Sequence, residues 1–128
     1  MIGIGIDLAS VPRFSRLAKL YGDRFLGRFL SAGELEHFRC IVAERAQSEY
    51  LASRWAAKEA LFKAVGEARV SEDPLLFPEV EVVSTGAASP TFRPHSRAWK
   101  EALQDRRVLL SLTHEEGGMA AAMVTASQ

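Results

Sequence analysis

Two carboxylates and a lysine have the residue types and positions that metal-assisted phosphate chemistry needs. Asp7 ends an N-terminal run with one glycine face, and Glu59 lies on a long helical segment with Lys63 four residues further along the same side. Mg²⁺ typically takes one or two carboxylates together with phosphate oxygens and waters. Lys63 and nearby arginines would then neutralise the phosphate charge.

A plainer interpretation of the same helix needs no ligand. Four apolar residues share one stripe at ~100° per residue: Leu51, Trp55, Phe62 and Val65. Lys58 projects into the middle of that stripe, where an ionised group is costly to bury unless it is paired or bound to a metal. Lys58 would then extend its charge outward along an apolar stem, and Glu59 and Lys63 would form a surface ion pair. Asp7 would only start the loop before Pro12.

Two histidines are further candidates for chemistry. His114 ends a predicted strand, where it could bind phosphate, act as a base or cap a hairpin, and Thr113 beside it can donate a hydroxyl hydrogen bond. His37 and Cys40 form an H-x-x-C pattern on a helix. The chain has one cysteine and no matching histidine pair, which argues against a zinc site.

Basic residues gather near the N-terminus of an otherwise neutral chain. The first thirty residues hold five Arg or Lys and two Asp, a local charge of +3, whereas 16 basic and 16 acidic residues balance over the whole chain. The neutral total argues against a general nucleic-acid binder. This basic flank, with Phe25 and Phe29 interleaved, could dock an acidic protein surface; its basic residues are Arg13, Arg16, Lys19, Arg24 and Arg28. The alternative is an ordinary solvated face.

The elements that position these residues are expected to form one domain, residues 1–128. With 48% hydrophobic residues, a chain of this length can bury a core unaided. The patterns predict strands at 2–8, 79–84, 91–93, 108–113 and 119–125, and helices at 11–21, 23–30, 31–43, 48–65 and 94–104. Consecutive strands near the C-terminus favour antiparallel pairing. The expected fold class is therefore α+β, an antiparallel sheet with one long and several short helices.

Local signals set several of these boundaries. Residues 2–8 alternate between isoleucine and glycine, the pattern of a strand with one buried, isoleucine-lined face, and the bare glycine face leaves room for something bulky. Ser31 and Glu34 form a capping box at a helix start. Gly22 and Gly66 are helix stop signals.

The sequence also indicates a compartment. A single cysteine excludes a disulfide within the chain and favours a reducing environment. No apolar run approaches the ~20 residues that span a bilayer. The N-terminus, MIGIGIDLAS, has neither the basic region nor the hydrophobic run of a signal peptide. The expected location is the cytoplasm, with no membrane partner.

Four sequence blocks, in order, extend over nearly the whole chain: GIGIDL near the N-terminus, FLSAGE at 29–34, RWAAKEALFKAVG at 54–66, and SLTH at 111–114 followed by AAAMV. Together they resemble holo-acyl-carrier-protein synthase, the small bacterial-type branch of the 4′-phosphopantetheinyl transferases. The resemblance implies that family's fold and the transfer of 4′-phosphopantetheine from coenzyme A to a serine of apo-acyl carrier protein, leaving adenosine 3′,5′-bisphosphate. It also implies a place in fatty acid biosynthesis, Mg²⁺ as the cation, and a homotrimer with active sites between subunits.

The same resemblance implies roles for individual residues. Asp7 and Glu59 match the family's metal-binding and catalytic carboxylates, and Lys63 matches the lysine that contacts the pyrophosphate. Three further residues match positions near the coenzyme's nucleotide: Arg54, Thr113 and His114. Three arginines match the basic helix that the family presents to the acidic carrier protein: Arg13, Arg24 and Arg28.

Two segments depart from the family pattern. Many members read F-G-T-G-I after the long helix and G-K-P after the middle strand, where this chain has VGEAR at 65–69 and GAASP at 86–90. Both segments lie near the coenzyme in the family, so the adenine-side contacts stay open. Also open is whether Glu59 activates the serine directly or through a water held by the cation. Two other functions fit the residues: a Mg²⁺-dependent hydrolase of nucleotide pyrophosphates, and a non-catalytic module that binds acidic proteins.

Overall fold

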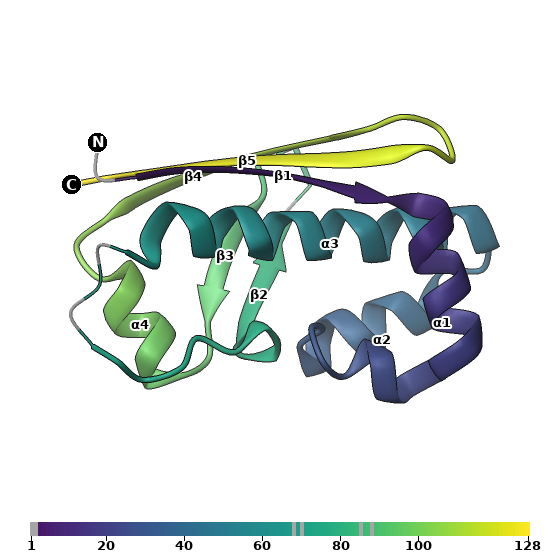
Figure 1. Ribbon diagram of the computed structural model, residues 1–128, viewed down its shortest axis with the longest axis horizontal. Coiled ribbons are helices and arrows are strands. Elements are labelled where there is room, and N and C mark those ends of the chain that lie inside the picture. The colour runs from purple at the N-terminus through teal and green to yellow at the C-terminus, as the bar shows by residue number, and fades with distance from the viewer. Residues whose placement is uncertain (1–2, 68, 70, 85, 88) are drawn as a thin grey trace.

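The computed structural model describes residues 3–67, 69, 71–84, 86–87 and 89–128. Ile2, Ala68 and Ala88, which belong to patterns discussed above, lie outside that part. The described elements are β1 (Gly3–Ser10), α1 (Val11–Leu26), α2 (Ala32–Cys40), α3 (Glu44–Val65), the 3₁₀ turn η1 (Phe77–Glu79), β2 (Val80–Val83), β3 (Thr91–Pro94), α4 (Arg97–Leu103), β4 (Arg107–His114) and β5 (Met119–Ser127) (Figure 1).

An antiparallel sheet and the long helix α3 form the two layers that position the candidate residues. The strand order is β1-β5-β4, and α3 runs along the inner face of this sheet (Figure 1). The register places Asp7 opposite Ala122, which in turn lies opposite Leu112. Strands β2 and β3 form a separate antiparallel pair. The predicted α+β class and the antiparallel pairing of the last two strands are confirmed.

The glycine face of β1 lies directly against α3. A Cβ atom added to Gly3 would come within 1.8 Å of the Ala64 carbonyl oxygen, and one added to Gly5 within 1.9 Å of the Ala60 carbonyl oxygen. The bulky neighbour anticipated beside this face is therefore the α3 backbone itself. Because only glycine permits so close an approach, the alternating pattern fixes the depth at which α3 packs and the position of Asp7 beside it.

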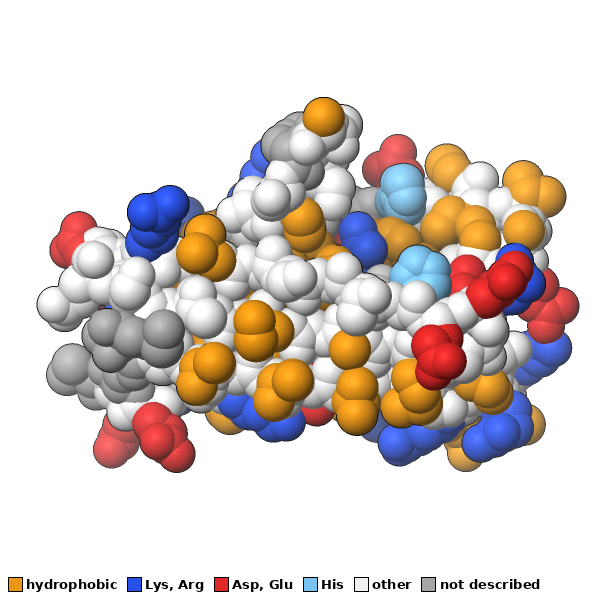
Figure 2. Space-filling view, turned by 90° about the horizontal axis from the view of Figure 1, so that it is seen from above, with side chains coloured by type: hydrophobic (Ala, Val, Ile, Leu, Met, Phe, Trp, Pro, Cys, Tyr) orange, Lys and Arg blue, Asp and Glu red, His pale blue; other side chains and the backbone are white. Residues whose placement is uncertain are grey.

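The isoleucine face of β1 was expected to be buried, and within this chain that prediction is wrong. Ile4 and Ile6 are 57% and 63% exposed. Six large apolar side chains, which together we call the outer sheet face, are exposed on the side of the sheet away from α3: Ile4, Ile6, Leu8, Leu109, Met119 and Met123. Figure 2 shows hydrophobic side chains gathered over this side. The strand pattern is amphipathic as predicted, but the helix covers the glycine side.

Several helix boundaries follow the predicted signals and others do not. Gly22 has φ 56° and ψ −142° and kinks α1, so the chain leaves the helix there as predicted and then re-enters it. Gly66 caps the end of α3. That helix begins at Glu44 rather than at about residue 48. The earlier start was not predicted, because Ala43 at the N-cap has no side chain that could form a capping hydrogen bond. Helix α4 starts at Arg97 instead of residue 94, which belongs to β3.

The core lies between the inner sheet face and the helices. Its largest fully buried apolar side chains are Trp99, Phe29, Leu51, Leu61, Val65, Val80 and Val124. Small residues line the contact between α3 and β5, with Ala60 and Ala122 almost completely buried. Within the described residues, none of the helices has the length and apolar character to cross a membrane.

Candidate functional site

Asp7, Glu59 and Lys63, which we call the carboxylate cluster, come together where β1 meets α3. Lys63 Nζ lies 3.1 Å from Asp7 Oδ1 and donates a hydrogen bond to the Ile6 carbonyl at 3.0 Å. The Asp7 side chain is 17% exposed, whereas that of Lys63 is half exposed. This ion pair joins Asp7 and Lys63, which are 56 residues apart in the sequence. The Asp7 carboxylate on the strand therefore lies close to the long helix, as predicted.

Glu59 is partly buried and lies near the charges of Asp7 and Lys63. Burial raises the pKa of the Glu59 carboxyl above its usual range, the charge of Asp7 raises it further, and Lys63 opposes both. Two oxygen donors of like charge that share one lysine suit a hard divalent cation, whose remaining ligands would be waters and phosphate oxygens. Among the described residues no group of three or more His, Cys, Asp or Glu could hold a metal ion, and Asp7 and Glu59 together could offer two carboxylate ligands.

Lys58 does not extend its charge outward, and that prediction was wrong. Its side chain is fully buried, and Nζ donates to Glu34 Oε1 at 2.5 Å, to the Phe29 carbonyl at 2.6 Å and to the Phe77 carbonyl at 2.9 Å. Burial lowers the pKa of Lys58, and the Glu34 carboxylate opposes that shift. The surface pair expected between Glu59 and Lys63 is likewise replaced, since Lys63 pairs with Asp7.

The FLSAGE block at 29–34 builds the site that receives Lys58. The capping box is present as predicted: Ser31 Oγ accepts from the Glu34 backbone N–H at 3.1 Å, and Glu34 Oε1 accepts from the Ser31 backbone N–H at 2.9 Å. Glu34 Oε2 accepts from the Val82 backbone N–H at 2.9 Å. A Cβ on Gly33 would come within 2.6 Å of Glu81 Oε1. Glu34 was identified as a helix cap, but its pairing with a lysine 24 residues away has no local signal.

The three residues predicted near the nucleotide line one cavity. It measures about 390 Å³ and lies between α3 and β4; we call it the α3–β4 cavity. Its lining residues are Ile41, Ala46, Glu49, Tyr50, Ser53, Arg54, Leu112, Thr113 and His114. His114 Nε2 lies 3.6 Å from Glu49 Oε2, which also accepts a hydrogen bond from the Gly117 N–H at 3.2 Å. His114 and Arg54 around one hollow can receive a phosphate group, whereas the register places Thr113 on the face of β4 that points away from α3, opposite Ala121.

Within this chain the α3–β4 cavity and the carboxylate cluster are separate. Arg54 and Glu59 are five residues apart on α3, so their directions differ by about 140° and their positions by about 7.5 Å along the helix. The lining of the cavity includes no member of the carboxylate cluster. Helix α3 therefore presents its two sets of chemical groups toward different sides of the molecule.

The three predicted arginines also come together. Arg13, Arg24 and Arg28 line a groove of about 370 Å³ with Leu17, Tyr21 and Phe25, which we call the arginine groove. The kink at Gly22 lies between Arg13 and the other two. An apolar floor with a basic rim fits a partner surface that combines apolar and acidic side chains.

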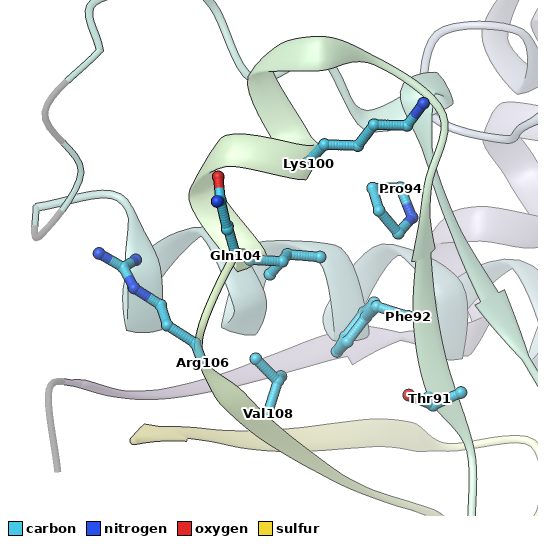
Figure 3. A pocket seen from close by; sticks show the side chains of 8 residues that line it. Thr91, Phe92, Pro94, Lys100, Gln104, Arg106 and Val108 are labelled. Carbon is cyan, nitrogen blue, oxygen red and sulfur yellow. The ribbon is translucent and has the colours of Figure 1, made fainter. Parts of the chain in front are cut away.

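A further cavity, of about 460 Å³, lies between β3, α4 and β4, away from every predicted residue. Figure 3 shows the Phe92 and Val108 side chains directed into it, while the Arg106 guanidinium points outward. Its lining mixes apolar side chains with Lys100, Gln104 and Arg106, and it includes no carboxylate or histidine. This cavity carries none of the chemistry considered above.

Comparison with known proteins defines the class of this protein. The chain matches the 4′-phosphopantetheinyl transferase superfamily over residues 3–122, and it belongs to that family. It is 37% identical to a holo-[acyl-carrier-protein] synthase of Nocardia farcinica over 97% of this chain and 86% of that protein. The crystal structure of the Neisseria meningitidis holo-[acyl-carrier-protein] synthase has a TM-score of 0.83 and 35% identity, with 100% of both chains covered. A Bacillus anthracis holo-(acyl-carrier-protein) synthase in complex with CoA (3′,5′-ADP) has a TM-score of 0.76 and 28% identity, over 98% and 95% of the chains.

Proposed function

We propose that this protein transfers 4′-phosphopantetheine from coenzyme A to a serine of an apo-acyl carrier protein. The observation that carries the proposal is the carboxylate cluster, formed by Asp7, Glu59 and Lys63 in a chain of this superfamily. A serine oxygen attacks the β-phosphorus of the coenzyme, and the bond to adenosine 3′,5′-bisphosphate breaks. Such reactions depend on positioning and on charge neutralisation more than on covalent assistance.

The cluster's members have distinct roles in this proposal. Asp7 and Glu59 would hold Mg²⁺. When bound, the cation supplies charge neutralisation at the pyrophosphate. Lys63, already held beside Asp7, stabilises the charge that develops on the leaving phosphate. Glu59 accepts the serine proton, directly or through one water, and its raised pKa favours that role.

The α3–β4 cavity is proposed to receive the phosphate on the coenzyme's ribose. Arg54 supplies its guanidinium and His114 its imidazole ring, and Thr113 lies beside them at the rim. Because the cavity and the carboxylate cluster face different sides of α3, one coenzyme would reach both only if two copies of the chain contribute. We therefore propose a homotrimer with its active sites between copies, packed through the outer sheet face. Exposed apolar surface of this kind is typical of protein interfaces.

The carrier protein is proposed to dock on the arginine groove. Three guanidinium groups, none in an ion pair with another residue that the structure describes, surround an apolar floor and fit an acidic helix that carries apolar side chains. The proposed setting is fatty acid biosynthesis in the cytoplasm, in keeping with the single exposed cysteine, Cys40.

The experiment combines the protein with coenzyme A, Mg²⁺ and an apo-carrier protein and follows the carrier by intact-mass spectrometry. We expect the added mass of one phosphopantetheine group per carrier, abolished by a chelator. Release of adenosine 3′,5′-bisphosphate without any carrier would instead identify a hydrolase. Carrier binding without coenzyme A affinity would identify a non-catalytic module.

Mixing two inactive variants tests the shared site. Asp7→Ala and Arg54→Ala each damage one of the two sets of groups. If one site draws on two copies, mixed oligomers contain some sites with both sets intact, and activity returns on mixing. Each variant alone is the control, and mixtures no more active than their components contradict the shared site.

A further inference from the structure

Tyr50 connects the α3–β4 cavity to the buried polar network around Glu34. The Arg54 guanidinium carbon lies 4.2 Å from the centroid of the Tyr50 ring, and the His37 ring stacks on it at 5.1 Å with an interplanar angle of 29°. The Tyr50 hydroxyl donates to the Glu34 backbone carbonyl at 3.3 Å. The ring is thus held on several sides.

Arg54 is held differently from other arginines of this chain. Arg45, for comparison, pairs with Glu116 at 2.5 Å on the surface. Arg54 is half-buried; its Nη1 donates to Ser53 Oγ at 3.3 Å, and its charge also acts on the Tyr50 hydroxyl, whose pKa it lowers against the effect of burial. Its Nε is buried without a partner among the described residues. An aromatic face and a hydroxyl therefore hold the guanidinium, which forms no ion pair with a carboxylate in the part of the chain that the structure describes.

A cation held in this way is available to a ligand anion. Arg side chains lose much rotamer freedom when they bind, and a contact that orders the guanidinium beforehand reduces that loss. An aromatic face does so without competing for the N–H donors, whereas a carboxylate would occupy them. Burial also raises the pKa of Tyr50 to about 12, although the neighbouring Arg54 charge opposes that shift.

We propose that Tyr50 is a positioning residue for coenzyme binding: its ring orders the Arg54 guanidinium at the wall of the α3–β4 cavity, ready for the phosphate on the coenzyme's ribose. The inference rests on the proposed function of that cavity. His37, on α2, stacks on the Tyr50 ring and does not line the α3–β4 cavity. The proposal therefore gives His37, for which a zinc site was argued against, a role in supporting that ring.

The test compares Tyr50→Leu, which removes the ring, with Tyr50→Phe, which keeps it. Each is assayed with coenzyme A and with 3′-dephospho-coenzyme A, which lacks the ribose phosphate. For Tyr50→Leu we expect KM for coenzyme A to rise about 3- to 30-fold, the range of an aromatic–guanidinium contact, with kcat within about twofold. KM for 3′-dephospho-coenzyme A should barely change, and Tyr50→Phe should behave like the unaltered protein.

The matched control is Phe38→Leu, which removes a ring 6.5 Å from Tyr50, whereas the ring that the Arg54 guanidinium overlies is that of Tyr50. A merely structural role for Tyr50 would shift both coenzymes equally, and Phe38→Leu would then mimic Tyr50→Leu. Equal KM values for Tyr50→Leu and the unaltered protein overturn the inference, as does a Tyr50→Phe variant that behaves like Tyr50→Leu. If the unaltered protein itself fails to modify any carrier, the proposed function has failed instead.

A second measurement covers the case in which Tyr50→Leu does not fold. In the unaltered protein, the Arg54 side-chain protons should show an upfield ring-current shift in NMR spectra, because the guanidinium lies over the ring. Adenosine 3′,5′-bisphosphate should perturb the Arg54 Nε–H signal when added. Protons of Arg54 at ordinary shifts overturn the inference.

Discussion

Replacing Lys58 by methionine tests how the long helix is anchored. The substitution keeps the apolar stem but removes the ammonium that bonds three acceptors, namely Glu34 Oε1 and the carbonyls of Phe29 and Phe77. Glu34, only 2% exposed, would be left as a buried carboxylate without its cation. Breaking such a pair by removing one partner costs about 3–5 kcal/mol.

This is a large fraction of the stability of a small domain, about 5–15 kcal/mol in total. For a chain of this length each kcal/mol lowers Tm by roughly 3–6 °C, so we expect a drop of about 10–25 °C. Urea titration followed by circular dichroism should show a lower midpoint and an unchanged slope, because the folded state loses stability rather than compactness.

Two further variants serve as controls for the Lys58→Met measurement. Lys19→Met removes a lysine from a pair with Glu44 in which both side chains are 65% exposed, and it should cost no more than about 1 kcal/mol. The double variant Lys58→Met with Glu34→Leu should recover part of the loss, since no unpaired charge stays buried. A Lys58→Met protein within about 1 kcal/mol of the original would refute the assignment of this pair as the anchor.

Three further outcomes follow from the site. Mg²⁺ at 100 times its Kd should stabilise the protein by about 2.7 kcal/mol in a thermal melt, and Asp7→Asn should abolish that gain while leaving the metal-free Tm nearly unchanged. The pKa of Glu59 is higher in the folded protein than in the unfolded chain. Between these two pKa values the folded protein binds more protons than the unfolded chain, so the free energy of unfolding falls as the pH rises through that range. Glu59→Gln, in chelator, should therefore equal the original at pH 4 in urea titrations and exceed it at pH 7; the reverse order contradicts the assigned environment. Arg24→Glu with Arg28→Glu should raise KM for the carrier at least tenfold and leave KM for coenzyme A unchanged; a change in both would place the arginines elsewhere in the mechanism.

Local patterns predicted much of the fold because their causes are local. The helix stop at Gly66, the kink at Gly22 and the capping box of Ser31 with Glu34 depend on backbone freedom and on hydrogen bonds three residues apart. The start of α3 at Glu44 was not predicted, because no side chain caps it and the sequence therefore carries no local signal there. Boundaries without a local cause have no sequence signal.

Residues of the candidate site were predicted to different degrees. The strand position of Asp7 and the helix position of Glu59 suggested a shared cation site, and the structure brings the two within electrostatic reach. The partner of Lys58 was missed, because a pairing over 24 residues depends on how α2 folds back on α3. Nor could periodicity reveal which face of β1 the helix covers, since an isoleucine face can be buried by this chain or by another copy.

That last ambiguity bears on how the site can work. The glycine face of β1 brings α3 so close that Asp7 and Glu59 converge beside it, and the same packing leaves Ile4 and Ile6 to solvent. One choice of residues thus creates the carboxylate cluster and the uncovered apolar surface together. Since Arg54 faces another side of the same helix, the proposed assembly is what would bring Arg54 of one copy and the carboxylate cluster of another to one ligand. The alternation of glycine with isoleucine in β1 therefore couples the proposed chemistry to the proposed assembly.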